Sequence, residues 1–144
     1  MTVTERNLGT RWFEEVWNKG RRDAIAEMLA PDGVLHEGKT DSIGPESFYE
    51  FFDRLNGPFS EFRVEVHDTI AEGDRVCLRW SCTCKHTGDA LGIPATQKTV
   101  HVTGMSIIRI ADGRMVEGWQ NWDMLGMMEQ IREHPKSLTY VSVR

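Results

Sequence analysis

The chain has 144 residues, of which 40% are hydrophobic, and this is enough for a single domain with a core of its own. The net charge of −5 and the lack of a Lys/Arg cluster argue against nucleic acid as a partner. No apolar run is long enough to span a membrane, and the polar N-terminus does not look like a signal peptide. We therefore expect a cytoplasmic protein without a membrane partner.

The first half of the chain is predicted to be mostly helical. Residues 4–19 have an amphipathic helical pattern, and a shorter helix over residues 22–30 is ended by Pro31. A short strand is expected over residues 33–37. Pro45 suits the first turn of a third helix, whose apolar side carries Phe48, Phe51, Phe52 and Leu55.

The second half changes to the two-residue alternation that is typical of strands. Strands are predicted over residues 62–70, 75–86, 99–110 and 114–122, and a short apolar helix follows, to residue 131. Helices followed by hairpin-linked strands predict an α+β domain, in which helices pack on one face of a curved antiparallel sheet and enclose an apolar cavity. Residues 138–143 are compatible with a strand, a docked extension or disorder.

The three cysteines all fall within the predicted strand over residues 75–86: Cys77, Cys82 and Cys84. Their spacing is not that of a zinc site, and an odd number argues against a disulfide framework, so we expect buried or half-buried thiols. The histidines are scattered, and the sequence has no nucleophile elbow, phosphate-binding loop or zinc-protease motif. No metal site is expected.

Asp123 lies where the last strand gives way to the last helix. Strand alternation places it on one face with Glu117, Trp119 and Asn121. A carboxylate at the end of a face built from Trp and Asn is a candidate general acid/base in an apolar pocket. Asp is also a good N-cap for the following helix, and the two roles do not exclude each other.

The final hairpin predicts a partner for Asp123. If residues 111–113 form a three-residue loop, Ile110 pairs with Arg114, and counting outwards places His101 opposite Asp123. The same register pairs Thr103 with Asn121 and Met105 with Trp119. A change of one residue in the loop would move His101 to the other face. A His–Asp pair can do acid–base work near neutral pH, or it can be a cross-strand pair of small structural value.

Further residues are weaker candidates for substrate contacts. His36 and Arg79 are polar groups on predicted strands, and a structural or solvated role is favoured over substrate contact for both. Aromatic and apolar side chains are predicted to line or narrow the cavity: Trp12, Trp80, Trp119 and Met105. The other sheet face, with Val100, Val102 and Trp122, is predicted to be convex and is the candidate for a dimer interface.

Several segments together resemble the SnoaL-like polyketide cyclases of the nuclear transport factor 2-like superfamily. The resemblance rests on Val16–Gly20 with Asp23–Ile25, on His86–Gly88 with Gly92–Pro94, and on Asp112–Trp119 with Asp123, Leu125 and Gln130. It covers nearly the whole chain, to about Ile131. The loop over residues 92–97 departs from the family, which more usually has a second Pro and a Gly, and a loop of another shape can admit another substrate.

The resemblance implies a cone-shaped α+β barrel with a deep apolar cavity, commonly in a homodimer. It also implies ring closure by intramolecular aldol condensation, without a metal or an organic cofactor. The family's acid/base position falls on Asp123, and His101 and Asn121 would polarise the substrate carbonyl and hold the enolate.

Three functional hypotheses follow. The first is a cofactor-independent enzyme that acts on a small apolar carbonyl or polyketide-like compound. The second is an epoxide hydrolase or dehydratase, in which Arg79 and Asp123 activate a water; it requires the two side chains to meet in the cavity. The third is a non-catalytic, dimeric module that binds a small ligand, and it predicts Asp123 occupied as a helix cap with His101 facing away.

Overall fold

The structure, a computed structural model, describes residues 1–132, so the predictions for residues 138–143 lie outside the described residues. The N-terminal segment is helical but not one helix. It consists of α1 (Val3–Arg6), α2 (Leu8–Trp12) and the π-helical η1 (Phe13–Asn18), followed by α3 (Ala24–Met28). A capping box between Thr2 and Glu5 starts α1, and the backbone at Asn7 leaves helical geometry before α2.

The segment between α3 and α4 differs most from the prediction. Strand β1 (Leu29–Glu37) begins before Pro31, where the sequence predicted helix as far as residue 30. A short strand that the sequence analysis missed, β2 (Thr40–Ile43), pairs back onto β1. Helix α4 (Gly44–Asn56) then follows and has Pro45 in its first turn, as predicted.

The remaining strands confirm the predicted pattern closely. They are β3 (Phe59–Glu72), β4 (Arg75–His86), β5 (Thr99–Ala111) and β6 (Arg114–Trp122), and helix α5 (Met124–Ile131) follows. The six strands form one sheet in the order β2-β1-β6-β5-β4-β3. All neighbours are antiparallel except β1 and β6, which run parallel and bring the start of the chain beside its last strand.

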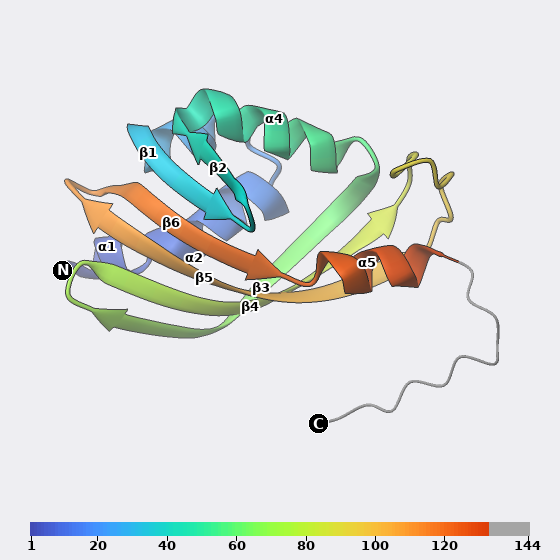
Figure 1. Ribbon diagram of the computed structural model, residues 1–144. Coiled ribbons are helices and arrows are strands. Elements are labelled where there is room, and N and C mark those ends of the chain that lie inside the picture. Colours follow the sequence, from blue (N-terminus) through green and yellow to red (C-terminus); the bar gives the residue numbers. More distant parts are fainter. Residues whose placement is uncertain (133–144) are drawn as a thin grey trace.

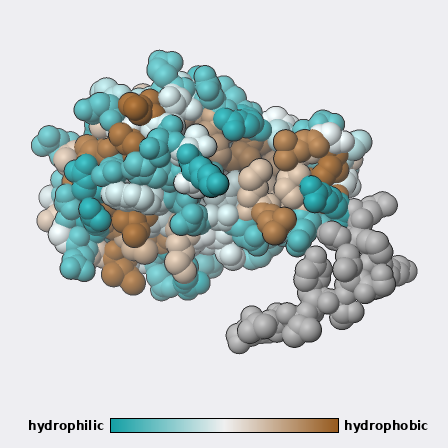
Figure 2. Space-filling model, in the orientation of Figure 1, coloured by the Kyte–Doolittle hydropathy of each residue, from teal (hydrophilic) through white to brown (hydrophobic). Residues whose placement is uncertain are grey.

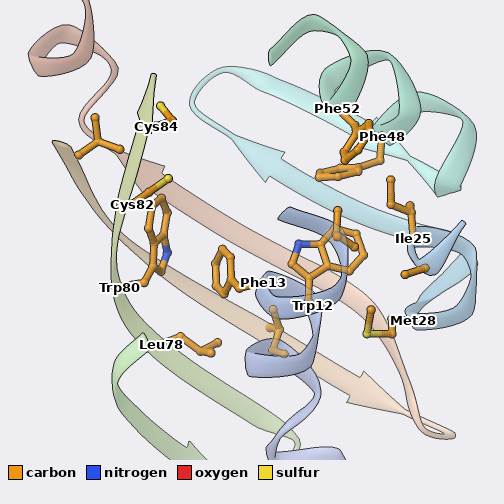
Figure 3. Packing of buried hydrophobic residues seen from close by; sticks show 14 of the residues in the cluster. Trp12, Phe13, Ile25, Met28, Phe48, Phe52, Leu78, Trp80, Cys82 and Cys84 are labelled. Carbon is orange, nitrogen blue, oxygen red and sulfur yellow. The ribbon is translucent and has the colours of Figure 1, made fainter. Parts of the chain in front are cut away.

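The sheet is curved, and α2, η1 and α4 cover one of its faces (Figure 1). We call the face toward these helices the inner face and the opposite one the outer face. Buried residues alternate along β4 and β5, so the inner side chains of β4 are Val76, Leu78, Trp80, Cys82 and Cys84. Figure 3 shows Leu78, Trp80, Cys82 and Cys84 on the same side of one strand.

Aromatic side chains from the helices fill much of the core. Trp12 packs edge-on against Phe48 with ring centroids 4.9 Å apart, and Phe13 lies 5.2 Å from Trp80. The core also holds Cys82 and Cys84 (Figure 3), and all three cysteines are free, with Cys77 half-buried, as predicted. Burial of each large apolar side chain contributes about 1.5–3 kcal/mol to folding.

Hydrophobic side chains also reach the surface in separate groups (Figure 2). On the outer face of β5 the side chains of Met105 and Ile107 are 57% and 39% exposed. Val100 and Val102 are buried on the inner face, and Trp122 lines an internal hollow. The prediction that Val100, Val102 and Trp122 lie on the convex face is therefore wrong. Within residues 1–132 no helix combines the length and hydropathy that a membrane crossing requires.

Candidate functional site

A cavity of about 380 Å³ lies between the inner face and the helices, and we call it the main cavity. Its apolar wall comes from both layers, with Trp12, Phe13, Phe48 and Phe51 from the helices and Leu35, Leu78 and Ile108 from the sheet. The polar and charged lining includes Glu37, Ser106 and Gln120 from the sheet and Arg54 from α4. A mostly apolar hollow of this size with a few polar groups suits a small organic molecule.

A chain of hydrogen bonds fixes the side chain of Gln120. The Trp80 indole N–H donates to Ser106 Oγ at 3.0 Å, and Ser106 Oγ donates to Gln120 Oε1 at 3.1 Å. An indole nitrogen is a donor only, so the Ser106 hydroxyl accepts from Trp80 and uses its own proton on Gln120. The amide NH₂ group of Gln120 is left to donate, and none of the residues from 1 to 132 accepts a bond from it.

Glu37 lies directly beside Gln120. The two are Cα partners in the parallel β1–β6 pair, and both line the main cavity. The Trp122 indole N–H donates to Glu37 Oε1 at 2.8 Å. Burial raises the pKa of the Glu37 carboxyl above its ordinary value, while the bond from Trp122 and the charge of Arg54 oppose that rise. A carboxyl group in such an environment is a candidate general acid/base.

The outer face of the same strand pair carries a different polar cluster. His36 Nδ1 lies 2.8 Å from Asp41 Oδ1, and its Nε2 lies 2.8 Å from Glu117 Oε2. The His36 ring stacks on Trp119 with centroids 5.4 Å apart. The hydrogen bonds to Glu117 and Asp41 raise the pKa of His36, and the bond from His36 lowers the pKa of Glu117. His36 therefore ties β2 to β6 through two carboxylates.

Asp123, predicted as the acid/base, is the N-cap of α5. Its Oδ1 accepts a hydrogen bond of 2.8 Å from the Gly126 N–H, and the side chain is exposed. The capping alternative is thus what the geometry shows. Asp123 does not line the main cavity, and its catalytic role stays a prediction.

The predicted pairing of His101 with Asp123 is wrong. Residues Asp112 and Gly113 form a two-residue turn with φ of 52° and 75°, so Ala111 pairs with Arg114. A bulge next to Arg109 then shifts the register further, and Met105 faces Asn121 instead of Trp119. Asp123 meets Thr103 through its backbone N–H, at 3.1 Å.

His101 and Asn121 are exposed on the outer face, away from the cavity lining. The backbone N–H and C=O of His101 are bound by the Gln130 side chain of α5, at 2.8 and 2.7 Å. Their predicted catalytic roles stay predictions. The residues of β6 that the prediction assigned to the other face, Gly118, Gln120 and Trp122, line the cavity. The register shift interrupts the predicted alternation at Val116, and Met115 is buried in its place.

The predicted substrate-contact residues divide between the two faces. Trp12 lines the main cavity from the helical layer, and Trp80 lines a smaller hollow beside it. His36 and Trp119 belong to the outer-face cluster but also border the main cavity. Met105 is exposed on the outer face, and Arg79 Nε donates to Asp68 Oδ2 at 2.6 Å on the surface. Arg79 and Asp123 therefore do not meet in the cavity, as the hydrolase and dehydratase hypothesis requires.

Glu37 and Gln120 were both missed by the sequence analysis. Alternation along β1 offered a signal, because an inward Leu35 implies an inward Glu37, two residues further on. In β5 the alternating apolar residues Val100 and Val102 marked the inner face, and the same alternation reaches Ser106. Because Ser106 pairs with Gln120, the correct register would have placed Gln120 on the inner face as well.

The arrangement of Glu37 and Gln120 can support proton transfer next to a carbonyl group. A carboxyl group stands beside an amide donor that is free to bind an oxygen. Within the described part of the chain, no three His, Cys, Asp or Glu side chains are grouped as metal ligands would be.

Comparison with known proteins gives a consistent result. Residues 7–131 match the sequence profile of a family described as SnoaL-like polyketide cyclase. The chain is 29% identical over 130 residues to the aklanonic acid methyl ester cyclase DnrD of Streptomyces peucetius, an alignment covering 85% of this chain and 88% of the relative. It is 30% identical over 129 residues to the enzyme of the same description, DauD, from Streptomyces sp. strain C5, covering 85% and 79%.

Solved structures share the fold. A protein from Jannaschia sp. CCS1, assigned to the SnoaL-like polyketide cyclases, superposes with a TM-score of 0.82 at 26% identity, covering 92% of this chain and 94% of that one. IdmH from Streptomyces antibioticus, assigned as a polyketide cyclase, superposes with a TM-score of 0.77 at 25% identity, covering 88% and 97%.

Proposed function

The chain belongs to the SnoaL-like polyketide cyclase family, and we propose that it closes a ring in a small apolar carbonyl compound by intramolecular aldol chemistry. The observation that carries this proposal is the side-by-side placement of Glu37 and Gln120 on the cavity wall. One group exchanges a proton and the other stabilises the oxygen that becomes negative.

In the proposed reaction, the Glu37 carboxylate removes a proton from the carbon next to a substrate carbonyl. The electrons of that C–H bond form the enolate double bond, and the carbonyl π electrons move to oxygen. The enolate carbon then forms a C–C bond with a second carbonyl carbon of the same molecule. The oxygen of that second carbonyl takes the proton from Glu37, so the product is an isomer of the substrate and Glu37 is regenerated.

Gln120 supplies the donor that this step needs. Its NH₂ group is held toward the substrate by the Trp80–Ser106 chain, so little reorganisation is needed when the enolate forms. A preorganised donor of this kind contributes about 10²–10³-fold in rate. The apolar part of the wall lowers the local dielectric and so strengthens the same hydrogen bond.

The experiment uses aklanonic acid methyl ester as substrate, because it is what the curated relatives are named for. Ring closure should give a product of unchanged mass and altered chromatographic retention. In D₂O, the carbon next to the carbonyl should also take up deuterium. Glu37→Gln should slow both processes by about 10²–10⁴-fold, as expected for the loss of a general base.

Asp123→Asn is the matched comparison, because Asn caps a helix as well as Asp does. It should leave both rates within about twofold of the wild type, since a side chain outside the reaction contributes little. If Asp123→Asn abolished deuterium uptake and Glu37→Gln did not, the assignment of Glu37 would fail and the original acid/base prediction would be restored.

A second candidate function is the non-catalytic binding module. Two observations favour it, because Asp123 is occupied as a cap and His101 faces away from the cavity, as that hypothesis predicted. It predicts that the compound binds without deuterium uptake or ring closure in wild-type protein.

A further inference from the structure

A smaller hollow of about 50 Å³, which we call the side lobe, lies next to the main cavity. Its lining includes apolar side chains from η1, the sheet and α5 that do not line the main cavity: Trp17, Phe62, Val64, Cys82, Val102 and Met127. Five residues line both hollows, namely Phe13, Phe51, Leu55, Gln120 and Trp122. The side lobe is therefore a continuation of the proposed substrate site.

Apart from the Gln120 amide, the polar groups around the side lobe are already engaged elsewhere. The Trp80 N–H donates to Ser106, and the Trp122 N–H donates to Glu37. The Cys82 thiol lies 3.5 Å from the Thr83 carbonyl oxygen. A water needs two to four polar partners, so this space favours an apolar occupant.

Gln120 lies at the junction of the two hollows. Its Oε1 is used by Ser106, so its NH₂ group is the donor that a carbonyl oxygen would meet there. Glu37 lines the main cavity and does not line the side lobe. A carbonyl carbon bound at Gln120 thus has one substituent toward Glu37 and room for the other in the side lobe.

We propose that the side lobe is the subsite for a short alkyl group on the carbonyl that Gln120 binds, so that the substrate contains an alkyl–CO–CH₂ unit. This inference rests on the proposed function of Gln120 and Glu37. The CH₂ group faces Glu37, and the alkyl group enters the side lobe. At roughly 15 Å³ for each water-sized group, the upper value for such a group, the lobe holds about three groups, which corresponds to propyl.

The test measures equilibrium binding, so it does not depend on turnover. The probes are 1-(2-naphthyl)propan-2-one and its homologues in which the methyl ketone becomes an ethyl, propyl or pentyl ketone. Isothermal titration calorimetry should show affinity rising about fourfold with each added carbon up to propyl, as expected for burial of one CH₂ group. The pentyl ketone should bind no better than the propyl ketone.

Val64→Phe fills the side lobe from β3, where Val64 is half-buried. This variant should bind the methyl ketone nearly as tightly as the wild type does. It should lose the gain in affinity from the methyl to the propyl ketone, which is about tenfold or more for two added CH₂ groups. Cys82→Ala enlarges the lobe and should move the best fit toward the pentyl ketone. Val66→Phe is the control, because Val66 lies on the same strand and lines neither hollow.

An equal loss of affinity for all four ketones in Val64→Phe, or the same loss in Val66→Phe, would overturn the subsite. So would affinity that keeps rising to pentyl in both wild type and Val64→Phe, or failure of all four ketones to bind. Glu37→Gln should retain the chain-length profile. If deuterium uptake fails in the wild type while that profile persists, the proposed catalysis is refuted and the subsite is upheld.

Discussion

The two faces of the β1–β6 pair have the same backbone and very different chemistry. On the outer face, His36 is bound on both ring nitrogens, and Glu117 also meets Arg109 at 3.3 Å. On the inner face, Glu37 and Gln120 each have one bond to a neighbouring side chain and keep capacity for another.

This difference separates a structural cluster from a reactive one. The outer charges satisfy each other, so they hold the β1–β2 hairpin in place and leave little for a ligand. The inner groups are oriented by donors that the core supplies, yet they face an open hollow. A polar group that is held but not saturated is the kind that can act on a substrate.

After Glu37→Gln, the largest expected effect comes from removing the inner amide. Gln120→Leu should slow deuterium uptake and ring closure by about 100-fold, the loss typical of one oxyanion donor. Asn121→Leu also replaces an amide side chain by leucine, at the next residue, which lies on the outer face. This variant should alter the rates by about twofold or less. Comparable losses in both variants would show that the two faces do not differ in function.

The second prediction concerns Gly104, whose missing side chain makes room for the Trp80 ring. Gly104→Ala should force Trp80 away from Ser106 and lower the free energy of unfolding by about 1–3 kcal/mol, as overpacking does. Urea denaturation would measure it. Thr103→Ala, on the exposed side of the same strand, should cost about 0.5 kcal/mol or less.

The third prediction concerns the outer face as a dimer interface. The predicted homodimer stays a prediction, and the exposed Met105 and Ile107 now replace the residues first assigned to it. Ile107→Lys should weaken association by about 1–2 kcal/mol in sedimentation equilibrium, the cost of a charge at an apolar contact. Leu125→Lys, on α5 and 66% exposed, is the control and should associate as the wild type does. An unchanged dimer in Ile107→Lys would refute this interface.

The smallest expected effect tests the outer cluster by pH. Because the folded-state pKa of His36 is raised by Glu117 and Asp41, its stabilising contribution is complete below the unfolded value of about 6.5. The contribution is lost as pH rises through the higher folded value. His36→Gln should therefore lower Tm by about 1–3 °C at pH 6 and by less as pH increases.

The control for His36 is His67→Gln. The His67 imidazole lies 2.7 Å from the Ser81 hydroxyl and is not bonded to a carboxylate. Its substitution measures the effect on Tm of removing an imidazole that lies outside the charge cluster. A His36→Gln difference that stayed constant or grew with pH would contradict the proposed charge cluster.

Local patterns in the sequence determined most of the elements. Two-residue alternation located β4 and β6 to within a residue, and the apolar side of residues 45–55 located α4. These features depend on near neighbours in the chain, because a strand or helix turns its residues toward the core at a fixed period. For the same reason, alternation placed Gly118, Gln120 and Trp122 together on one face of β6, although it failed at Val116, beside the register shift.

The candidate site needed information that near neighbours do not carry. Glu37 and Gln120 lie side by side because β1 pairs in parallel with β6, so that the first and last strands along the chain are neighbours in the sheet. The two-residue turn and the bulge near Arg109 set the register that separates His101 from Asp123. Which face is inner follows from helix packing, since the helices bury the more apolar face. The sequence by itself determined the family and most of the elements, and long-range pairing and burial decided which side chains face the cavity.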